Sequence, residues 1–208
     1  MDKHDGHPAN ADGLSSQAME PQASPPKASI PDAVRFYIDC EFDGHGGPLL
    51  SFGIESDAGR GLHYRVSDAP PVQDPWVAEN IIPIMGQHCA TLNYRGPLNA
   101  LGAVLRKFIE PCEQPIIIAD SPVDIGRFCA AISTNAEGGW ASAEYPLMRF
   151  EVHNVDCWPN DLNGGVQHNA WWDAKALRNT LAKAMSAYGQ DPQGLGAKPA
   201  SAVAKPFA

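Results

Sequence analysis

Two carboxylates separated by a single residue lie in an otherwise apolar stretch, residues 35–42. They are Asp39 and Glu41, and because side chains alternate between the faces of a strand, both project from one side, roughly 6 to 7 Å apart. Such a pair can bind a divalent cation, and without cations or hydrogen-bond donors its two charges would repel each other. The alternative interpretation is the solvated face of an edge strand.

A second pair of carboxylates follows the short apolar segment 116–119. Asp120 comes directly after this segment, and Asp124 falls in the first turn of a predicted helix. Ligands of α/β sheets commonly bind at the edge where such strands end, so both side chains are candidates for a site there. The alternative is ordinary capping, because aspartate at a helix start accepts hydrogen bonds from free backbone N–H groups.

A histidine and an aspartate near the start of the last predicted helix form the third candidate. Asn169 suits the N-cap position, which places His168 on the preceding loop and Asp173 in the first helical turns. An imidazole beside a fixed carboxylate suits general-base chemistry, with the aspartate holding a metal while the histidine accepts a proton from water. The alternative is a surface histidine with a solvated helical aspartate.

Strands and helices alternate in the order needed to bring these residues together. β-Branched and aromatic residues predict an antiparallel meander of three strands, at 35–42, 48–55 and 62–66. Helical spacing of apolar residues predicts helices at 75–85, 97–109, 123–132 and 169–187, the first two with a proline near the start and the last with Gly189 placed to end it. Further strands are expected at 116–119, covered on both faces, and near 148–152.

This pattern predicts an α/β (α+β) fold, a mixed β-sheet flanked by α-helices. Residues 1–31 are rich in proline and polar residues, and we expect a disordered arm there. Residues 32–188 would form the one domain, and residues 189–208 a flexible tail.

Composition restricts the class of protein. The net charge of −9 argues against a simple electrostatic clamp on nucleic acid, although two bound divalent cations would bring four positive charges to an acidic site. No apolar run approaches the ~20 residues that a membrane span needs, and the N-terminus has no secretory signal, so we expect a cytoplasmic protein. The five widely spaced cysteines are typical of free thiols rather than of a disulfide framework.

Taken in order, the motifs resemble those of a known enzyme superfamily. Asp-x-Glu, an aspartate at the head of a helix and His-x-Ala-x-x-Asp are similar to the DEDDh branch of the DEDD 3′-to-5′ exonucleases, which have a ribonuclease-H-like fold. The phrase YIDCEFDG at 37–44, followed by LLSFGI at 49–54, most resembles the mycobacterial-type exoribonuclease AS family, over residues 35–187. Ala119 and Asp120 depart from the His and Asn usual in the second motif, which puts one contact to the terminal nucleotide in doubt.

The resemblance implies a role for each matched residue. Two Mg²⁺ or Mn²⁺ ions would be bound by Asp39, Glu41, Asp124 and Asp173, with His168 as the general base. Contacts to the last nucleotide would come from Phe42, Asp43, Gly44 and Asp120.

The expected activity is removal of nucleoside 5′-monophosphates from the 3′ ends of single-stranded nucleic acid, with RNA preferred over DNA. Relatives of this kind also suggest a homodimer. Two alternatives remain open, a DNA proofreading or repair exonuclease and an inactive nuclease-like module that binds or scaffolds nucleic acid.

Overall fold

The computed structural model describes residues 34–87, 90–141 and 147–189. Contacts divide the chain into residues 1–30 and 31–208, and every described element belongs to the second unit. The expected N-terminal arm and most of the expected C-terminal tail fall outside the described residues. The elements are β1 (Arg35–Phe42), β2 (Leu49–Ser56), β3 (Gly61–Val66), α1 (Pro75–Asn80), α2 (Ile82–Met85), β4 (Leu92–Gly96), α3 (Leu98–Ile109), β5 (Ile116–Ala119), α4 (Pro122–Ile132), β6 (Arg149–Val152), the 3₁₀ turn η1 (Pro159–Asp161) and α5 (Ala170–Gly189).

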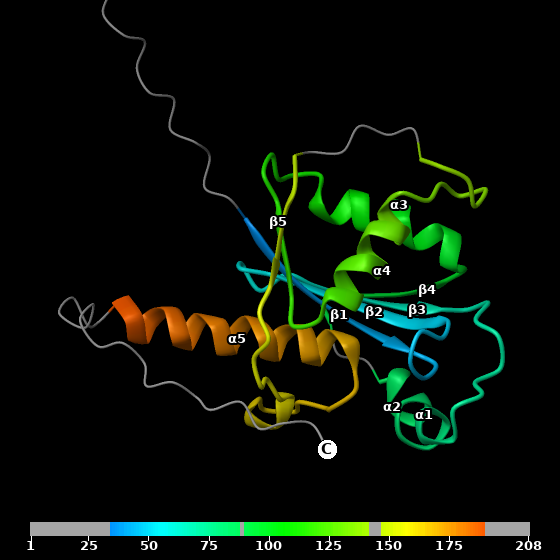
Figure 1. Cartoon of the computed structure of the whole chain (residues 1–208), viewed down its shortest axis with the longest axis horizontal. Coiled ribbons are helices and arrows are strands. Elements are labelled where there is room, and N and C mark those ends of the chain that lie inside the picture. Colours follow the sequence, from blue (N-terminus) through cyan, green and yellow to red (C-terminus); the bar gives the residue numbers. More distant parts are fainter. Residues whose placement is uncertain (1–33, 88–89, 142–146, 190–208) are drawn as a thin grey trace, which may run out of the picture. The chain divides into compact units, whose positions relative to one another are not determined.

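The described strands form a six-stranded mixed sheet in the order β4-β3-β2-β1-β5-β6 (Figure 1). The predicted meander is confirmed, because β1 pairs with β2 and β2 with β3, both antiparallel. β5 lies parallel to β1 and carries β6 on its other side, also in parallel. The sheet and its helices confirm the predicted α/β class.

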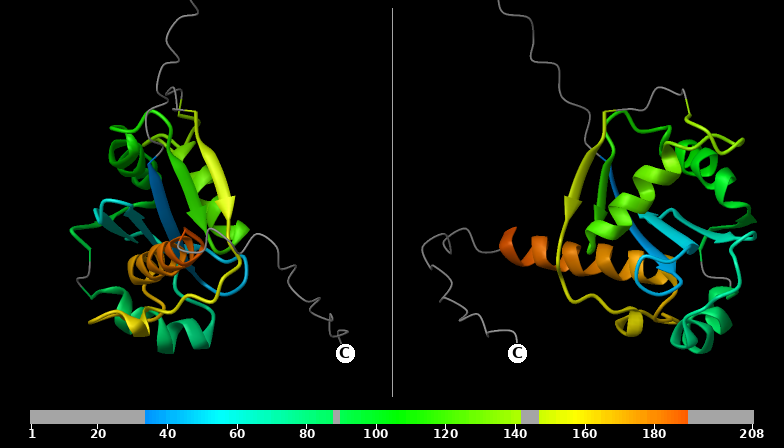
Figure 2. Two further views of the ribbon diagram at one scale, coloured as in Figure 1. Left: turned by 90° about the vertical axis from the view of Figure 1, so that its left-hand side faces the viewer. Right: turned by 45° about the vertical axis from the view of Figure 1, so that its right-hand side comes forward.

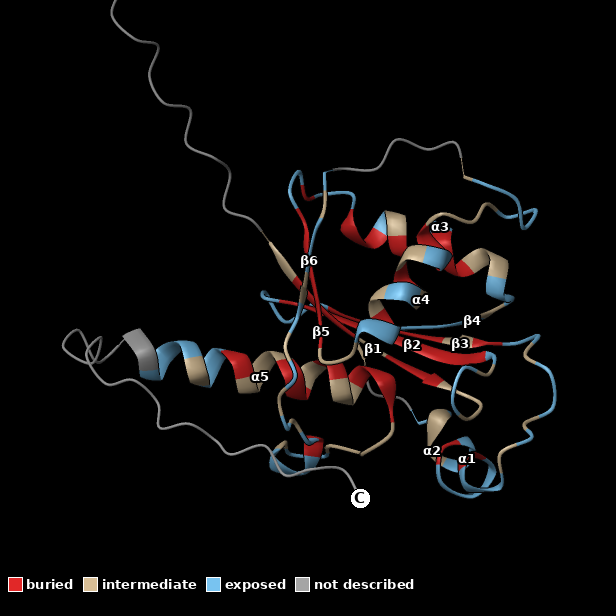
Figure 3. Cartoon of the chain, in the orientation of Figure 1, coloured by how far each residue is buried: buried red, intermediate tan, exposed pale blue. Residues whose placement is uncertain are grey.

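Helices cover the two faces of the sheet differently. α3 and α4 pack on one face, and α5 crosses the other, as the turned views make plain (Figures 1 and 2). Phe36, Ile38 and Cys40 of β1 point into the larger apolar core, which includes residues of α3 and α4. Tyr37 points the other way and packs with Leu177 of α5. Figure 3 shows burial concentrated in the central strands and in the half of α5 that crosses them.

Two predicted elements differ from the structure. The helix expected at 75–85 is broken at Ile81, which ends α1 and begins α2. A continuous helix would place Pro83 in its interior, where the ring clashes with the preceding turn and the N–H is missing. Strand β4 was not predicted, because it is only five residues long and mostly exposed. The alternation of Leu92 and Tyr94 with polar residues covers just two apolar positions, and the strand becomes recognisable through its parallel pairing with β3.

None of the helices in the described part of the chain combines the length and apolar character needed to cross a membrane.

Candidate metal centre

Strand β1 delivers the first two carboxylates to the face that α5 covers. Asp39 lies opposite Gly53 of β2, and Glu41 lies opposite Ser51. Gly53 allows α5 to begin directly on the sheet, because a Cβ atom there would lie 2.2 Å from the carbonyl carbon of Ala170. The register shifts just after Glu41, so a β-bulge ends the regular pairing beside the two acids.

The first turn of α5 adds a third carboxylate to this pair. Ligand oxygens of Asp39, Glu41 and Asp173 all lie within 4.8 Å of one another. Asn169 occupies the predicted capping position, since its side-chain oxygen accepts a hydrogen bond from the Trp172 amide at 3.4 Å. Backbone N–H groups of Asn169 and His168 donate in turn to the Asp173 carboxylate, which fixes it at the start of the helix.

A second triplet of carboxylates shares Asp39 with the first. Oxygens of Asp39, Asp120 and Asp124 also lie within 4.8 Å of one another. The N-cap of α4 is Ser121, which accepts the Val123 amide at 3.1 Å, so neither later acid occupies the cap position itself. Asp120 accepts the backbone N–H of Ser121, as the capping alternative expects of an acid at a helix start, and still belongs to the triplet. Asp124 therefore stands in the first turn of α4 with its carboxylate turned to the cluster.

Burial and mutual repulsion make this cluster electrostatically unfavourable when it is ionised. Burial is the largest cause in each case, and it raises the pKa of Glu41 to about 8 and the pKa values of Asp124 and Asp173 to about 7. Burial, followed by the charges of Asp173 and Glu41, also raises the pKa of Asp39 well above its ordinary value. At neutral pH the protein alone therefore holds these acids partly protonated.

The surroundings of the cluster offer little positive charge. Within the described ranges, none of the five carboxylates forms a salt bridge. Arg127 lowers the pKa of Asp124 slightly, but its guanidinium donates to the Gly47 carbonyl and lies 5.5 Å from the centre of the Phe42 ring. Clustered carboxylate oxygens without a protein cation are the donors that Mg²⁺ and Mn²⁺ prefer, so the residues fit the implied ions.

A buried hydroxyl and a thiol border the cluster. Ser51, opposite Glu41, is fully buried, and its hydroxyl finds no hydrogen-bond partner among the described residues. Cys157 lies with its Sγ 3.8 Å from an oxygen of Asp120. Neither neighbour was predicted, because no role was assigned to Ser51 within the LLSFGI phrase and Cys157 belongs to no motif.

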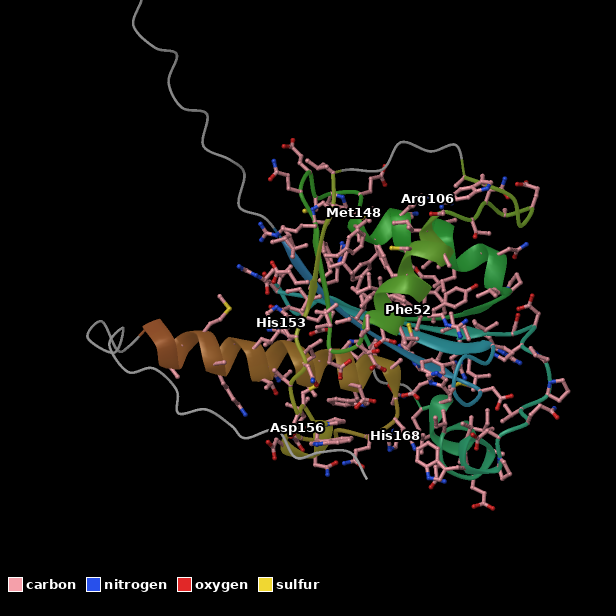
Figure 4. The ribbon with its side chains drawn as sticks, in the orientation of Figure 1. Phe52, Arg106, Met148, His153, Asp156 and His168 are labelled. Carbon is pink, nitrogen blue, oxygen red and sulfur yellow. The ribbon has the colours of Figure 1, made fainter. Side chains whose placement is uncertain are left out.

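His168 stands on the loop before α5 and adopts a left-handed backbone conformation, with φ of 58°. Figure 4 shows it between the start of α5 and helix α1. Its ring meets the Trp76 ring of α1 edge to face, with the centroids 5.0 Å apart. Trp76 is half exposed, so this contact lies at the surface beside the cluster. No motif had indicated Trp76.

The segment predicted to touch the last nucleotide lies outside the two carboxylate triplets. The ring of Phe42 packs on the core of the α3 and α4 face. The Asp43 carboxylate accepts the backbone amides of Gln73 and Asp74 at 2.8 and 2.9 Å, and thereby holds the start of α1. Gly44 has φ of 61°, and a Cβ there would lie 3.0 Å from an oxygen of Asp74.

Comparison with known proteins adds no relatives. No family model matches the chain, and no curated protein is significantly similar to it. Any functional assignment therefore depends on the residues, on the motifs they form and on their geometry.

Proposed function

We propose that this chain is a nuclease that depends on two divalent cations, Mg²⁺ or Mn²⁺, bound by Asp39, Glu41, Asp124 and Asp173. The observation that carries the proposal is the sharing of Asp39 between two triplets of carboxylate oxygens. A shared carboxylate can bridge two neighbouring ions, the arrangement that two-metal phosphodiester hydrolysis requires. Asp120, which belongs to the second triplet, is a further ligand or a substrate contact.

The raised pKa values support the same assignment. Carboxylates held partly protonated at neutral pH gain free energy when cations replace their protons. Bound there, the two ions would polarise an attacking water and offset the negative charge of a phosphodiester. The net charge of −9 favours such ions as a source of positive charge at the site.

The chain's own residues would then complete the site. His168 is the candidate base, because its own backbone N–H donates to the Asp173 carboxylate, which keeps its loop next to that member of the cluster. The edge-to-face contact with Trp76 limits the orientations of the His168 ring. A base held in this way accepts a proton from the attacking water without a large loss of side-chain freedom at each turnover.

The direction and the substrate depend on the family resemblance of the motifs. We propose 3′-to-5′ removal of nucleoside 5′-monophosphates from single-stranded ends, with RNA preferred over DNA, by a homodimer in a reducing, cytoplasmic compartment. Phe42, Asp43 and Gly44 would affect binding of the terminal nucleotide indirectly, because they position helix α1 and the adjoining β-bulge. The four described cysteines, all free thiols, agree with a reducing compartment.

The decisive test is degradation of a 5′-labelled RNA oligonucleotide in the presence of Mn²⁺. We expect stepwise shortening from the 3′ end, lost on removal of the metal with EDTA. Asp39→Ala and Asp173→Ala should each reduce the rate by on the order of 10³-fold, because they remove charge that acts on the transition state. Glu113→Ala, which changes an exposed carboxylate after α3, is the matched control and should retain the rate.

Three results would redirect the assignment. Shortening that survives both aspartate substitutions would place the active site elsewhere. A higher rate on matched single-stranded DNA than on RNA would indicate a repair-type exonuclease. Tight RNA binding without metal-dependent turnover would indicate a nucleic-acid-binding module.

A further inference from the structure

A fully buried glutamate outside the carboxylate cluster joins strand β2 to helix α5. Glu55 is only 1% exposed and faces α5 at the end of its strand. One carboxylate oxygen accepts the indole N–H of Trp171 at 2.8 Å, and the other accepts the guanidinium of Arg178, also at 2.8 Å. Neither carboxylate triplet includes Glu55, and the proposed chemistry assigns it no role.

Glycines leave the space that this contact needs. Gly61 of β3 lies opposite Glu55 in the sheet register. A Cβ atom at Gly61 would lie 2.0 Å from the indole nitrogen of Trp171 and 2.5 Å from a Glu55 oxygen. Gly53, two residues before Glu55, leaves the same kind of room for the Ala170 backbone. Gly53, Glu55 and Gly61 of the sheet thus form a cradle around the first turn of α5.

The helix geometry connects this cradle to the metal centre. At about 100° per residue, Trp171 and Arg178 lie seven residues apart and on one flank of α5. Asp173 lies on the opposite flank, and the fully buried Ala174 faces the sheet between them. A rotation of α5 about its axis would therefore move Asp173 relative to β1 and break the hydrogen bonds to Glu55.

We propose that Glu55 is a positioning residue for the metal centre, which fixes the rotation of α5 and thereby the placement of Asp173 beside Asp39 and Glu41. The inference rests on the proposed function in one respect, that Asp173 is a metal ligand. It extends that function to a buried carboxylate, an indole and a guanidinium that touch neither the ions nor the substrate. Groups that orient metal ligands in this way commonly change metal affinity by about 10- to 100-fold when removed.

The test measures Mn²⁺ affinity by titration calorimetry in the full-length protein. Glu55→Gln keeps the shape of the side chain, but its single carbonyl oxygen can serve only one of the two donors. We expect it to raise the Kd for Mn²⁺ about 10-fold while circular dichroism shows the wild-type fold. Trp171→Phe removes the indole N–H contact together with part of a buried ring, but it leaves the Arg178 contact to Glu55. It should also raise the Kd, so it keeps the test valid if Glu55→Gln does not fold.

Tyr37→Phe is the matched control. Tyr37 lies opposite Glu55 in the register and packs against a later part of α5, and its hydroxyl donates to Asp57 at 2.9 Å. We expect this variant to lose stability while its Kd for Mn²⁺ stays within about 2-fold of the wild-type value, because it leaves the cradle intact.

The outcomes separate the two proposals. Glu55→Gln or Trp171→Phe with lower thermal stability but wild-type Mn²⁺ affinity would reduce Glu55 to a purely structural role and overturn the inference. Wild-type protein that binds no Mn²⁺ would overturn both the inference and the proposed function. Wild-type protein that binds Mn²⁺ but degrades no RNA would remove the nuclease assignment and leave the positioning role standing.

Discussion

The two faces of strands β1 and β2 consist of alternate residues of the same short segments, yet they have opposite chemistry. On the face covered by α3 and α4, Ile38, Phe52 and Ile54 are all fully buried in one apolar core. On the face covered by α5, Asp39 and Glu41 stand beside Ser51, and Glu55 follows two positions beyond Gly53. The first face is therefore apolar along both strands, whereas the second combines a smaller apolar cluster around Tyr37 with carboxylates whose charges are unfavourable in the protein alone.

This difference shows how a small sheet can accommodate a cluster of buried carboxylates. A strand alternates its side chains with a period of two, so a substitution can change one face with little effect on the other. The apolar face supplies the burial that offsets the unfavourable charges of the acidic face. Neighbouring residues of β1 should consequently respond to mutation in opposite ways.

Ile38→Ala is expected to have the largest effect on stability. The side chain is fully buried, and its removal leaves a cavity in the main core, so the free energy of unfolding should fall by about 2 to 5 kcal/mol. Urea denaturation followed by circular dichroism measures this loss. The Kd for Mn²⁺ of the folded variant should stay at the wild-type value, and a weakened affinity would contradict the independence of the two faces.

Asp39→Asn should change the free energy of unfolding in the opposite direction and increase it. Burial raises the pKa of Asp39, so folding of the chain at neutral pH must either protonate this carboxylate or bury its charge. An asparagine side chain is neutral and requires neither. We expect the metal-free variant to be more stable than wild type at pH 7, measured as a higher midpoint of urea denaturation in EDTA.

The pH dependence provides the control for this second variant. Well below pH 4, Asp39 is protonated in both the folded and the unfolded chain, so the gain from Asp39→Asn should disappear there. A variant that is less stable than wild type at neutral pH would show that the carboxylate serves packing or hydrogen bonding instead.

Local patterns in the sequence were sufficient to predict much of the fold. The alternation in β1 placed Asp39 and Glu41 on one side, and capping chemistry placed Asn169 at the start of α5. Both predictions are confirmed, because each depends on residues that are neighbours in the chain. The same reasoning missed β4, whose five mostly exposed residues offer only a short alternation at Leu92 and Tyr94.

Contacts between distant segments could not be predicted in this way. Asp120 joins Asp39 only because β5 pairs with β1, and strand order leaves no trace in local periodicity. Glu55 meets Trp171 across 116 positions of the chain, and a lone glutamate at a strand end gives no hint of its partner. The metal-binding and catalytic roles of the five acids and His168 stay predictions.

The smallest expected effect is the pH dependence of stabilisation by Mn²⁺. Ordinary carboxylates have pKa values near 4, whereas burial raises those of Asp124 and Asp173 to about 7 and that of Glu41 to about 8. Between these limits the folded protein holds protons that the unfolded chain has lost. Stability of the metal-free protein from these groups is thus fully present below about pH 4 and is lost as the pH rises through 7 to 8.

Mn²⁺ must displace the same protons, so its affinity should rise over this window. A tenfold gain between about pH 6 and pH 8 corresponds to about 1.4 kcal/mol, or a further rise in Tm of about 3 to 6 °C on Mn²⁺ addition. Thermal unfolding with saturating Mn²⁺ and with EDTA across this range measures the difference. Asp173→Asn should reduce the pH dependence of the Mn²⁺-induced rise in Tm. An equal rise at pH 6 and pH 8 in the wild-type protein would mean that Mn²⁺ binds away from the buried acids on the α5 face.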